Sequence, residues 1–161
     1  MPIRISVMLT ILCVLWSPAG MAMAKKDDKA VVSLHVETDA TENPKMIFAQ
    51  EIGGVTRYFR RIPEISIKDM AVFTPFPNES GDYGVVFRLK PRGANRLSAF
   101  TAVNQGRHLL ATINGRAVDT VVIDSQIQDG VLVVWKGLNL PDIQSLDAVL
   151  PRAGEEGKKK R

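Results

Sequence analysis

The sequence predicts an α+β protein in which two helices pack on one face of a mostly antiparallel sheet. Two patterns point to this class. Short stretches in which apolar and polar residues alternate recur along the chain, separated by turns rich in Gly, Pro and Asn. Two other stretches carry apolar residues at helical spacing. The composition, 45% hydrophobic and 24% charged in 161 residues, is that of an ordinary globular protein and favours a single domain.

The first segment, residues 1–24, is expected to be a signal peptide. Arg4 gives it a positive start, and residues 5–16 form an apolar run too short to span a bilayer as a helix. Ala22-Met23-Ala24 has the small-x-small form that signal peptidase reads, so we expect cleavage after Ala24 and a periplasmic or secreted product. An uncleaved membrane anchor is the alternative. Cleavage would also remove Cys13, the single cysteine, and with it any thiolate chemistry.

Residues 31–81 are expected to form a β-rich N-terminal segment. The expected strands in it are residues 31–38, 45–50 and 55–61. The first strand alternates so that Val32, Leu34 and Val36 share one face. Gly53-Gly54, between the other two strands, is a hairpin signal.

The end of this segment contains a helix-start signal followed by structure breakers. Ser66-Ile67-Lys68-Asp69 has the form of a capping box and could open one or two helical turns. The densest group of breakers in the chain follows at Pro75, Pro77, Asn78 and Gly81. We therefore place an internal boundary near residue 81.

Residues 82–151 are expected to form an α+β module. The expected strands are residues 84–90, 107–113, 117–127 and 131–135. Asn114-Gly115 predicts a tight hairpin, because both central residues of a type I′ turn need positive φ. A helix is expected from about Ala94 to Asn104, with Ala94, Leu97, Phe100 and Val103 on its buried stripe. Asn139 is expected to cap a second helix, which turns Ile143, Leu146, Val149 and Leu150 inward.

The net charge of +4 is concentrated at the ends of the chain. Residues 30–151 are nearly neutral, whereas the charged linker at 25–30 and the basic tail at 152–161 carry the excess. The tail has too few apolar residues to pack and is expected to be disordered. A solubilising role is favoured, and weak contact with a membrane surface is the alternative. Nucleic-acid binding is disfavoured, because the body has no basic motif interleaved with aromatic residues.

The residues that could carry chemistry form no recognisable motif. His35 and His108 lack the ligand spacing of a metal site, and His108 is expected to face solvent. Asp119, Asp124 and Asp129 fall along strands and turns, where surface or turn roles are favoured over a carboxylate site. The sequence therefore predicts no catalytic, cofactor-binding or metal-binding residue, no cofactor and no enzyme.

The sequence also contains a basic patch and an exposed-or-buried tryptophan, and each has both a structural and a functional interpretation. Arg88, Lys90, Arg92 and Arg96 form the densest basic patch of the body, which could meet an acidic ligand but more simply is a solvated face. Trp135 ends an apolar strand and is favoured as a core or rim residue over a recognition residue.

The second half of the chain resembles the head subdomain of the large periplasmic domain in the SecD/SecDF protein-export family. The similar residues are Val85-Val86-Phe87-Arg88-Leu89-Lys90-Pro91-Arg92-Gly93-Ala94, then Leu97, Phe100, Thr101, Asn104 and Gly106, residues 109–118, Ile123, Ile127 and Gly130, and finally Leu146-Asp147-Ala148-Val149-Leu150-Pro151. One departure is Thr120-Val121-Val122-Ile123, where the family has a proline.

The resemblance implies a ferredoxin-like head arrangement for residues 84–151 and speaks more for fold than for function. It implies a non-enzymatic exported module with a protein or polypeptide partner, contacting polypeptides or an envelope protein complex during protein export. SecD itself spans the membrane several times, and we expect no span after residue 24. The alternative is a small-ligand binder or enzyme whose site is assembled from scattered Arg, His and Asp residues.

Overall fold

The computed structural model describes residues 30–155. The expected signal peptide and the last six residues of the expected tail lie outside the described residues. The strands are β1 (Val32–Thr38), β2 (Ile47–Ile52), β3 (Val55–Arg60), β4 (Ile65–Ser66), β5 (Met70–Pro77), β6 (Tyr83–Leu89), β7 (His108–Ile113), β8 (Arg116–Val122) and β9 (Val131–Leu138). The helices are α1 (Pro91–Val103), α2 (Leu140–Asp147) and the short 3₁₀ helix η1 (Ile67–Asp69).

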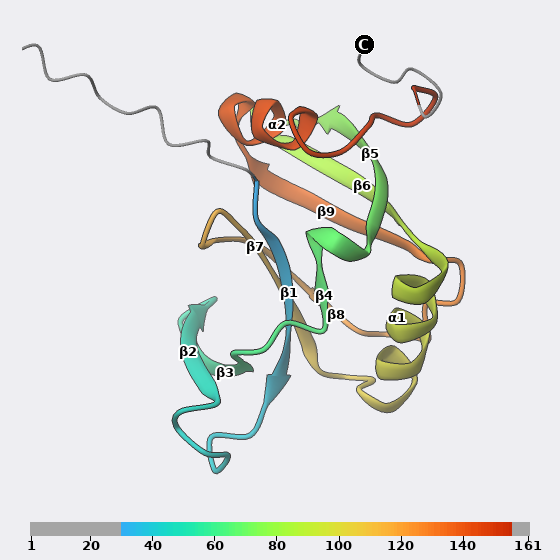
Figure 1. The fold of residues 1–161 in the computed structure, drawn as a ribbon. Coiled ribbons are helices and arrows are strands. Elements are labelled where there is room, and N and C mark those ends of the chain that lie inside the picture. The colour runs from blue at the N-terminus through green and yellow to red at the C-terminus, as the bar shows by residue number, and fades with distance from the viewer. Residues whose placement is uncertain (1–29, 156–161) are drawn as a thin grey trace, which may run out of the picture.

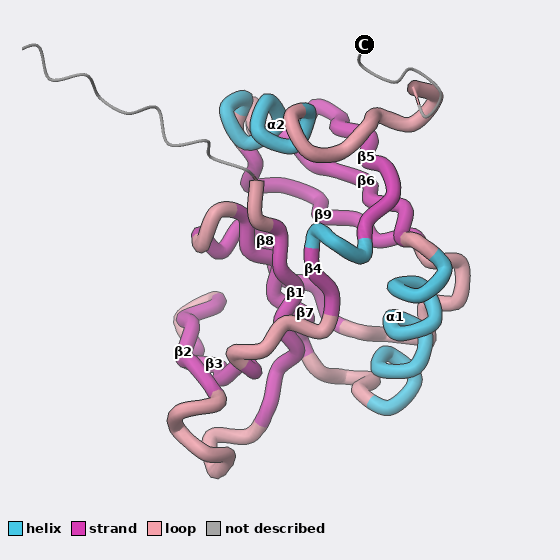
Figure 2. Tube along the Cα trace, viewed as in Figure 1, coloured by secondary structure: helices cyan, strands magenta, loops and turns pink. Residues whose placement is uncertain are grey.

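The predicted α+β class, with antiparallel strands and two α-helices, is confirmed (Figures 1 and 2). The strands are divided between two sheets, which the sequence patterns did not reveal. The larger sheet has the order β2-β3-β1-β7-β8, with β4 also paired to β1. The smaller sheet has the order β5-β6-β9. Helix α1 connects the smaller sheet to β7, and α2 follows β9 near β5 and β6 (Figure 1).

Strands from both sides of the boundary expected near residue 81 pair with each other. β1 pairs with β7, and β5 pairs with β6 through a register that places Phe73 opposite Phe87. Val32, Leu34 and Val36 are buried in the same core cluster as Phe87, so the predicted inner face of β1 is confirmed. Residues 31–81 and 82–151 therefore share one core, and the turn near residue 81 only connects two paired strands.

The local turn and cap signals are confirmed. Gly53 and Gly54 have φ of 58° and 78°, and Asn114 and Gly115 have φ of 52° and 78°, as the tight hairpins β2–β3 and β7–β8 require. At α2 the Asp142 amide donates to Asn139 Oδ1 at 2.9 Å, and the Asn139 amide donates to Asp142 Oδ2 at 3.0 Å. This reciprocal pair satisfies two amides that a helix start leaves without partners.

The buried stripe of α1 differs from the prediction. Val103 is 79% exposed, and the buried face consists of Gly93, Leu97, Phe100 and Thr101. Each three-residue step falls about 60° short of a full helical turn, so a stripe continued at that spacing rotates away from the core. Phe100 still faces the core, but Val103, one step later, faces solvent.

Two strand predictions also need correction. The expected strand at 117–127 ends at Val122, and the Ile127 amide then donates to Thr101 Oγ1 at 3.0 Å, which directs the loop back to α1. β5 was not predicted, because Pro75 and Pro77 resemble breakers. Both prolines are tolerated because β5 is an edge strand, where a missing N–H costs no ladder hydrogen bond.

The expected linker and tail are shorter than predicted. Ala30 is only 3% exposed and belongs to the core cluster, so residue 30 is part of the fold. The amide of Ala153 donates to the carbonyl of Phe73 at 3.0 Å, and Arg152 forms a bidentate ion pair with Asp147. The first residues of the expected tail are therefore bonded to the body. Within residues 30–155, no helix is both long and apolar enough to cross a membrane.

Candidate functional site

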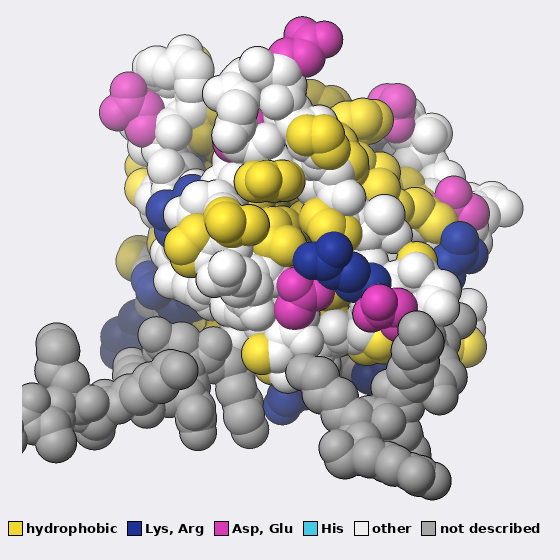
Figure 3. Space-filling model, turned by 90° about the horizontal axis from the view of Figure 1, so that it is seen from above, with side chains coloured by type: hydrophobic (Ala, Val, Ile, Leu, Met, Phe, Trp, Pro, Cys, Tyr) yellow, Lys and Arg dark blue, Asp and Glu magenta, His cyan; other side chains and the backbone are white. Residues whose placement is uncertain are grey.

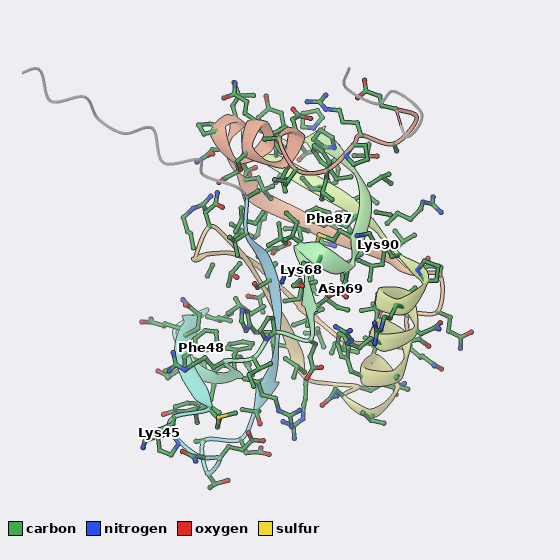
Figure 4. All side chains as sticks on the ribbon, in the orientation of Figure 1. Lys45, Phe48, Lys68, Asp69, Phe87 and Lys90 are labelled. Carbon is green, nitrogen blue, oxygen red and sulfur yellow. The ribbon has the colours of Figure 1, made fainter. Side chains whose placement is uncertain are left out.

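The outer face of the larger sheet is covered by the β2–β3 hairpin. Phe48 of β2 meets the ring of His35 edge-on, with centroids 5.2 Å apart, and lies 6.0 Å from the ring of Phe59 on β3 (Phe48 is labelled in Figure 4). Phe59 and Leu110 are buried here, although neither belongs to the main core cluster. The hairpin thus builds a second, smaller cluster, which we call the hairpin cluster (His35, Phe48, Phe59 and Leu110).

Glu37 is the most connected polar residue at the edge of the hairpin cluster. Its Oε1 accepts from Arg57 at 2.7 Å, while Oε2 accepts from the His108 amide at 2.8 Å and lies 2.7 Å from His108 Nδ1. Partial burial alone would raise the pKa of Glu37, but the hydrogen bonds from Arg57 and His108 outweigh burial and hold the pKa below its ordinary value. Glu37 therefore stays ionised and joins β1, β3 and β7.

The expectation that His108 faces solvent is wrong. Its side chain is only 18% exposed and lies against Glu37. His108 does lie on the face opposite Leu109, as the alternation predicts, but that face is covered by the hairpin rather than by water. No spacing rule could have joined Glu37 to His108, because 71 positions separate them.

His35 is held in the same cluster by one defined hydrogen bond. Its Nδ1 donates to the carbonyl of Arg60 at 2.9 Å, because a carbonyl can only accept. Burial lowers the pKa of His35, and this hydrogen bond offsets the effect only in part. His35 therefore acts as a neutral packing residue against Phe48.

Two grooves flank β2, one at each end. A groove of about 310 Å³ lies between β2 and β8, which we call the β2–β8 groove; it is lined by Gln50, Glu51, Ile52, Leu110, Ala117, Val118, Asp119, Thr120 and Lys136. A second groove of about 350 Å³, the Met46 groove, is lined by Glu42, Asn43, Met46, Arg60, Ile62 and Glu64. Both combine apolar side chains with charges of both signs. The β2–β8 groove joins residues 50–52 to residues 110–136, and the Met46 groove joins residues 42–46 to residues 60–64, so local sequence patterns reveal neither.

The three aspartates that sequence reasoning considered do not converge. Asp119 accepts from the Trp135 amide at 2.7 Å, Asp129 from the Val131 amide at 3.0 Å, and Asp124 from the Ser125 hydroxyl at 3.1 Å. These are backbone and turn contacts. In the part of the chain that the structure describes, no group of three or more His, Cys, Asp or Glu could hold a metal ion.

Two of the four basic side chains around the start of α1 have hydrogen-bond partners, and the other two are exposed. Lys90 donates to the carbonyl of Lys68 at 2.8 Å, and Arg96 reaches Asp69 Oδ2 at 3.4 Å (Lys68, Asp69 and Lys90 are labelled in Figure 4). Arg88 and Arg92 are exposed. On the face seen in Figure 3, apolar side chains are bordered by both acidic and basic ones, and several basic side chains lie together at its left edge.

The arrangement resembles solved structures although the sequence comparisons find nothing. No family model and no curated protein matches the chain. A structure of SecDF, described as a membrane component that enhances protein export, matches with a TM-score of 0.53 at 20% identity, over 73% of this chain and 60% of that one. SecDF in its super-membrane-facing form matches with a TM-score of 0.52 at 19% identity, over 73% of this chain and 18% of that one.

These matches concern the fold. This chain spans 60% or less of the SecDF chains, so it corresponds to a part of them. Residues 82–161 make up about half of the sequence, so a match over 73% of the chain must also include residues before residue 82. The protein therefore has a SecDF-like α+β fold, and the resemblance observed in its second half is confirmed and extended into its first half.

Proposed function

We propose that the protein is an exported, non-enzymatic module that binds polypeptide segments in support of protein export. The observation that carries this proposal is the SecDF-like fold over 73% of the chain. The module would act past the inner membrane after cleavage behind Ala24. Its partner would be a polypeptide in transit or the exposed segment of an envelope protein complex.

The shape of the described surface supports a polypeptide partner over a small substrate. The β2–β8 groove is an open trough beside a sheet edge, and its lining contains both apolar and polar side chains. A small-ligand site built from the scattered chemical residues would need Arg88, Arg92 and His108 to line one pocket with an aspartate. The β2–β8 groove contains Asp119 but none of those three, and His108 is engaged by Glu37.

Binding of an unfolded protein by the purified protein tests the proposal. The probe is a reduced, carboxymethylated secretory protein carrying a fluorophore, and the control is the same protein with its disulfides intact. We expect the fluorescence anisotropy of the unfolded probe to rise on titration, with a dissociation constant in the micromolar range, about −8 kcal/mol. Equal binding of both forms, or no binding of either at about 1 mM, would contradict a role in binding polypeptides in transit.

A further inference from the structure

Every sheet presents two edges, and a protein normally covers them because an open edge recruits other strands. In the smaller sheet, the edge at β5 is covered by the C-terminal residues. The amide of Phe73 donates to the carbonyl of Pro151 at 3.2 Å, and the amide of Ala153 donates back to Phe73 at 3.0 Å. Pro75 and Pro77 offer no N–H further along the same strand.

The edges at β8 and β9 cover each other. The Trp135 amide of β9 donates to Asp119 of β8 at 2.7 Å, and Arg116 of β8 donates to the carbonyl of Gly137 at 2.9 Å. A Cβ at Gly137 would overlap the carbonyl oxygen of Val118, so the two strands pass in direct contact. Little of either edge is left for another strand.

β2 is different, because it pairs with β3 alone. The two-residue turn makes Ile52 and Val55 a hydrogen-bonded pair, and such pairs alternate along an antiparallel ladder. Gln50 and Phe48 therefore direct their N–H and C=O groups to β3, whereas Ala49 and Glu51 direct theirs to the open side. Among the described strands of three residues or more, β2 is the one whose outer edge meets no other strand or backbone segment. Only side chains reach this edge: Arg61 donates to the carbonyl of Ile47 at 2.8 Å, and Gln50 donates to the carbonyl of Glu51 at 3.3 Å. Within the described structure, the amides of Ala49 and Glu51 and the carbonyl of Ala49 stay open to an added strand.

The charges beside this edge favour a particular partner. The β2–β8 groove holds Glu51 and Asp119 against one base, Lys136. The Met46 groove at the other end of β2 holds Glu42 and Glu64 against Arg60. The β2–β8 groove thus carries one more acid than base, which favours a segment with Lys or Arg beside it. At the Met46 groove the neighbouring Arg61, which donates to the carbonyl of Ile47, offsets the acid excess. Ile62 is 65% exposed and Met46 is 45% exposed, so apolar side chains of the segment also find contacts.

We propose that the open edge of β2 binds an extended polypeptide segment by strand addition, the segment being apolar with a basic residue at the end that lies beside Glu51. The backbone groups of Ala49 and Glu51 supply the hydrogen bonds, and the two grooves take side chains of the added strand. This proposal rests on the proposed function and specifies where on the fold the polypeptide binds. Glu51 lies on the edge itself and faces the basic residue of the segment.

The first test removes the edge donor without disturbing the hairpin. Ala49→Pro deletes an N–H that points away from β3, so the ladder between β2 and β3 is kept. Ala49→Thr is the matched control, because it changes the side chain but keeps the N–H. The probe is a labelled peptide of alternating Val and Thr with Lys at both ends. We expect Ala49→Pro to weaken its binding about tenfold or more, and Ala49→Thr to leave it within about twofold.

The second test changes the charge and does not depend on proline. Glu51→Lys reverses the charge on the edge, and Glu79→Lys makes the same change in net charge in the exposed turn after β5. We expect Glu51→Lys to weaken binding of the Lys-flanked peptide several-fold at low salt, an effect that disappears at about 1 M salt. Glu79→Lys should bind like the parent protein. Equal effects of the two variants would mean that net charge alone matters, which would overturn the proposal.

The outcomes separate this proposal from the proposed function. If the parent protein and Ala49→Pro bind the peptide equally well, the edge proposal fails while polypeptide binding stands. If the parent binds neither the peptide nor the unfolded protein, the proposed function itself fails. Sedimentation equilibrium tests whether a second copy of this chain occupies the edge instead. If the parent protein is a dimer and Ala49→Pro is a monomer, the edge binds another copy of the chain, and the proposal is overturned.

Discussion

The two faces of β1 support two clusters of different character. The inner face turns Val32, Leu34 and Val36 into the main core, a cluster that also contains apolar side chains of both sheets and both helices. The outer face turns His35 and Glu37 toward the β2–β3 hairpin. There His35 makes an edge-on aromatic contact and a hydrogen bond to a backbone carbonyl, and Glu37 forms ion pairs. The same strand thus joins a pH-independent core to a cluster whose groups can titrate.

This difference predicts that the two clusters open separately. Burial of apolar area stabilises the main core, and this contribution does not depend on protonation. The hairpin cluster instead depends on groups whose contribution changes with pH and salt. Regions with few buried apolar contacts open locally at lower free energy than the global unfolding transition. We therefore expect the hairpin to exchange its amides before the rest of the larger sheet does.

The largest effect is expected from a cavity in the main core. Phe87→Ala removes a ring with no exposed surface, and loss of such a buried aromatic side chain costs about 3–5 kcal/mol (Phe87 is labelled in Figure 4). Urea denaturation should show the loss in one cooperative transition, because both sheets contribute to this core. A change below about 1 kcal/mol would mean that the core relaxes around the cavity or that Phe87 is not buried.

An intermediate effect is expected from neutralising Glu37. Glu37→Gln keeps the shape but leaves Arg57 and His108 without their carboxylate, which should cost about 1–3 kcal/mol. Hydrogen exchange should accelerate at β2 and β3 while the amides of β6 keep their protection. Glu79→Gln, in an exposed turn, is the control and should change neither. Equal acceleration in both sheets would show that the hairpin does not open on its own.

A smaller effect is expected on mild acidification. The pKa of His35 is lowered in the folded protein, so the open state takes up a proton first as the pH falls below about 6.5, and docking of the hairpin weakens. At lower pH, Glu37 acts in the same direction, because its pKa is also lowered and its contribution is lost as the carboxylate becomes protonated. Hydrogen exchange at about pH 7.5 and 5.5, corrected for intrinsic rates, should reveal faster exchange confined to β2 and β3. In His35→Phe this pH dependence should decrease.

The smallest effect is expected at the end of α1. Val103→Ala removes a side chain that is 79% exposed and should change stability by less than about 0.5 kcal/mol. Phe100→Ala, one step earlier on the predicted stripe, should be far more destabilising, since Phe100 is 7% exposed. Thermal melts of the two variants compare them directly. A similar loss of stability in both variants would mean that Val103 is buried, as the sequence predicted.

The features that sequence could predict depend on neighbouring residues. Asn114-Gly115 specifies its turn through backbone conformation, and Asn139 with Asp142 specifies a helix start through two hydrogen bonds, so both were predictable. The contact between Glu37 and His108 depends on the pairing of distant strands and on a hairpin that folds over them. Leu110, an apolar residue on the same face of β7 as His108, was the one available signal that something covers this face.

The pairing of β1 with β7 also limits when the protein can fold. Val32 lies opposite Ile113, and Val36 lies opposite Leu109, so the central ladder of the larger sheet joins residues more than seventy positions apart. Contacts between such distant segments form slowly, because the loop between them must close before the pairing contributes free energy. A chain that has emerged only as far as residue 107 still lacks the strand that pairs with residues 32–36. Emergence of the second half of the chain therefore precedes assembly of the larger sheet.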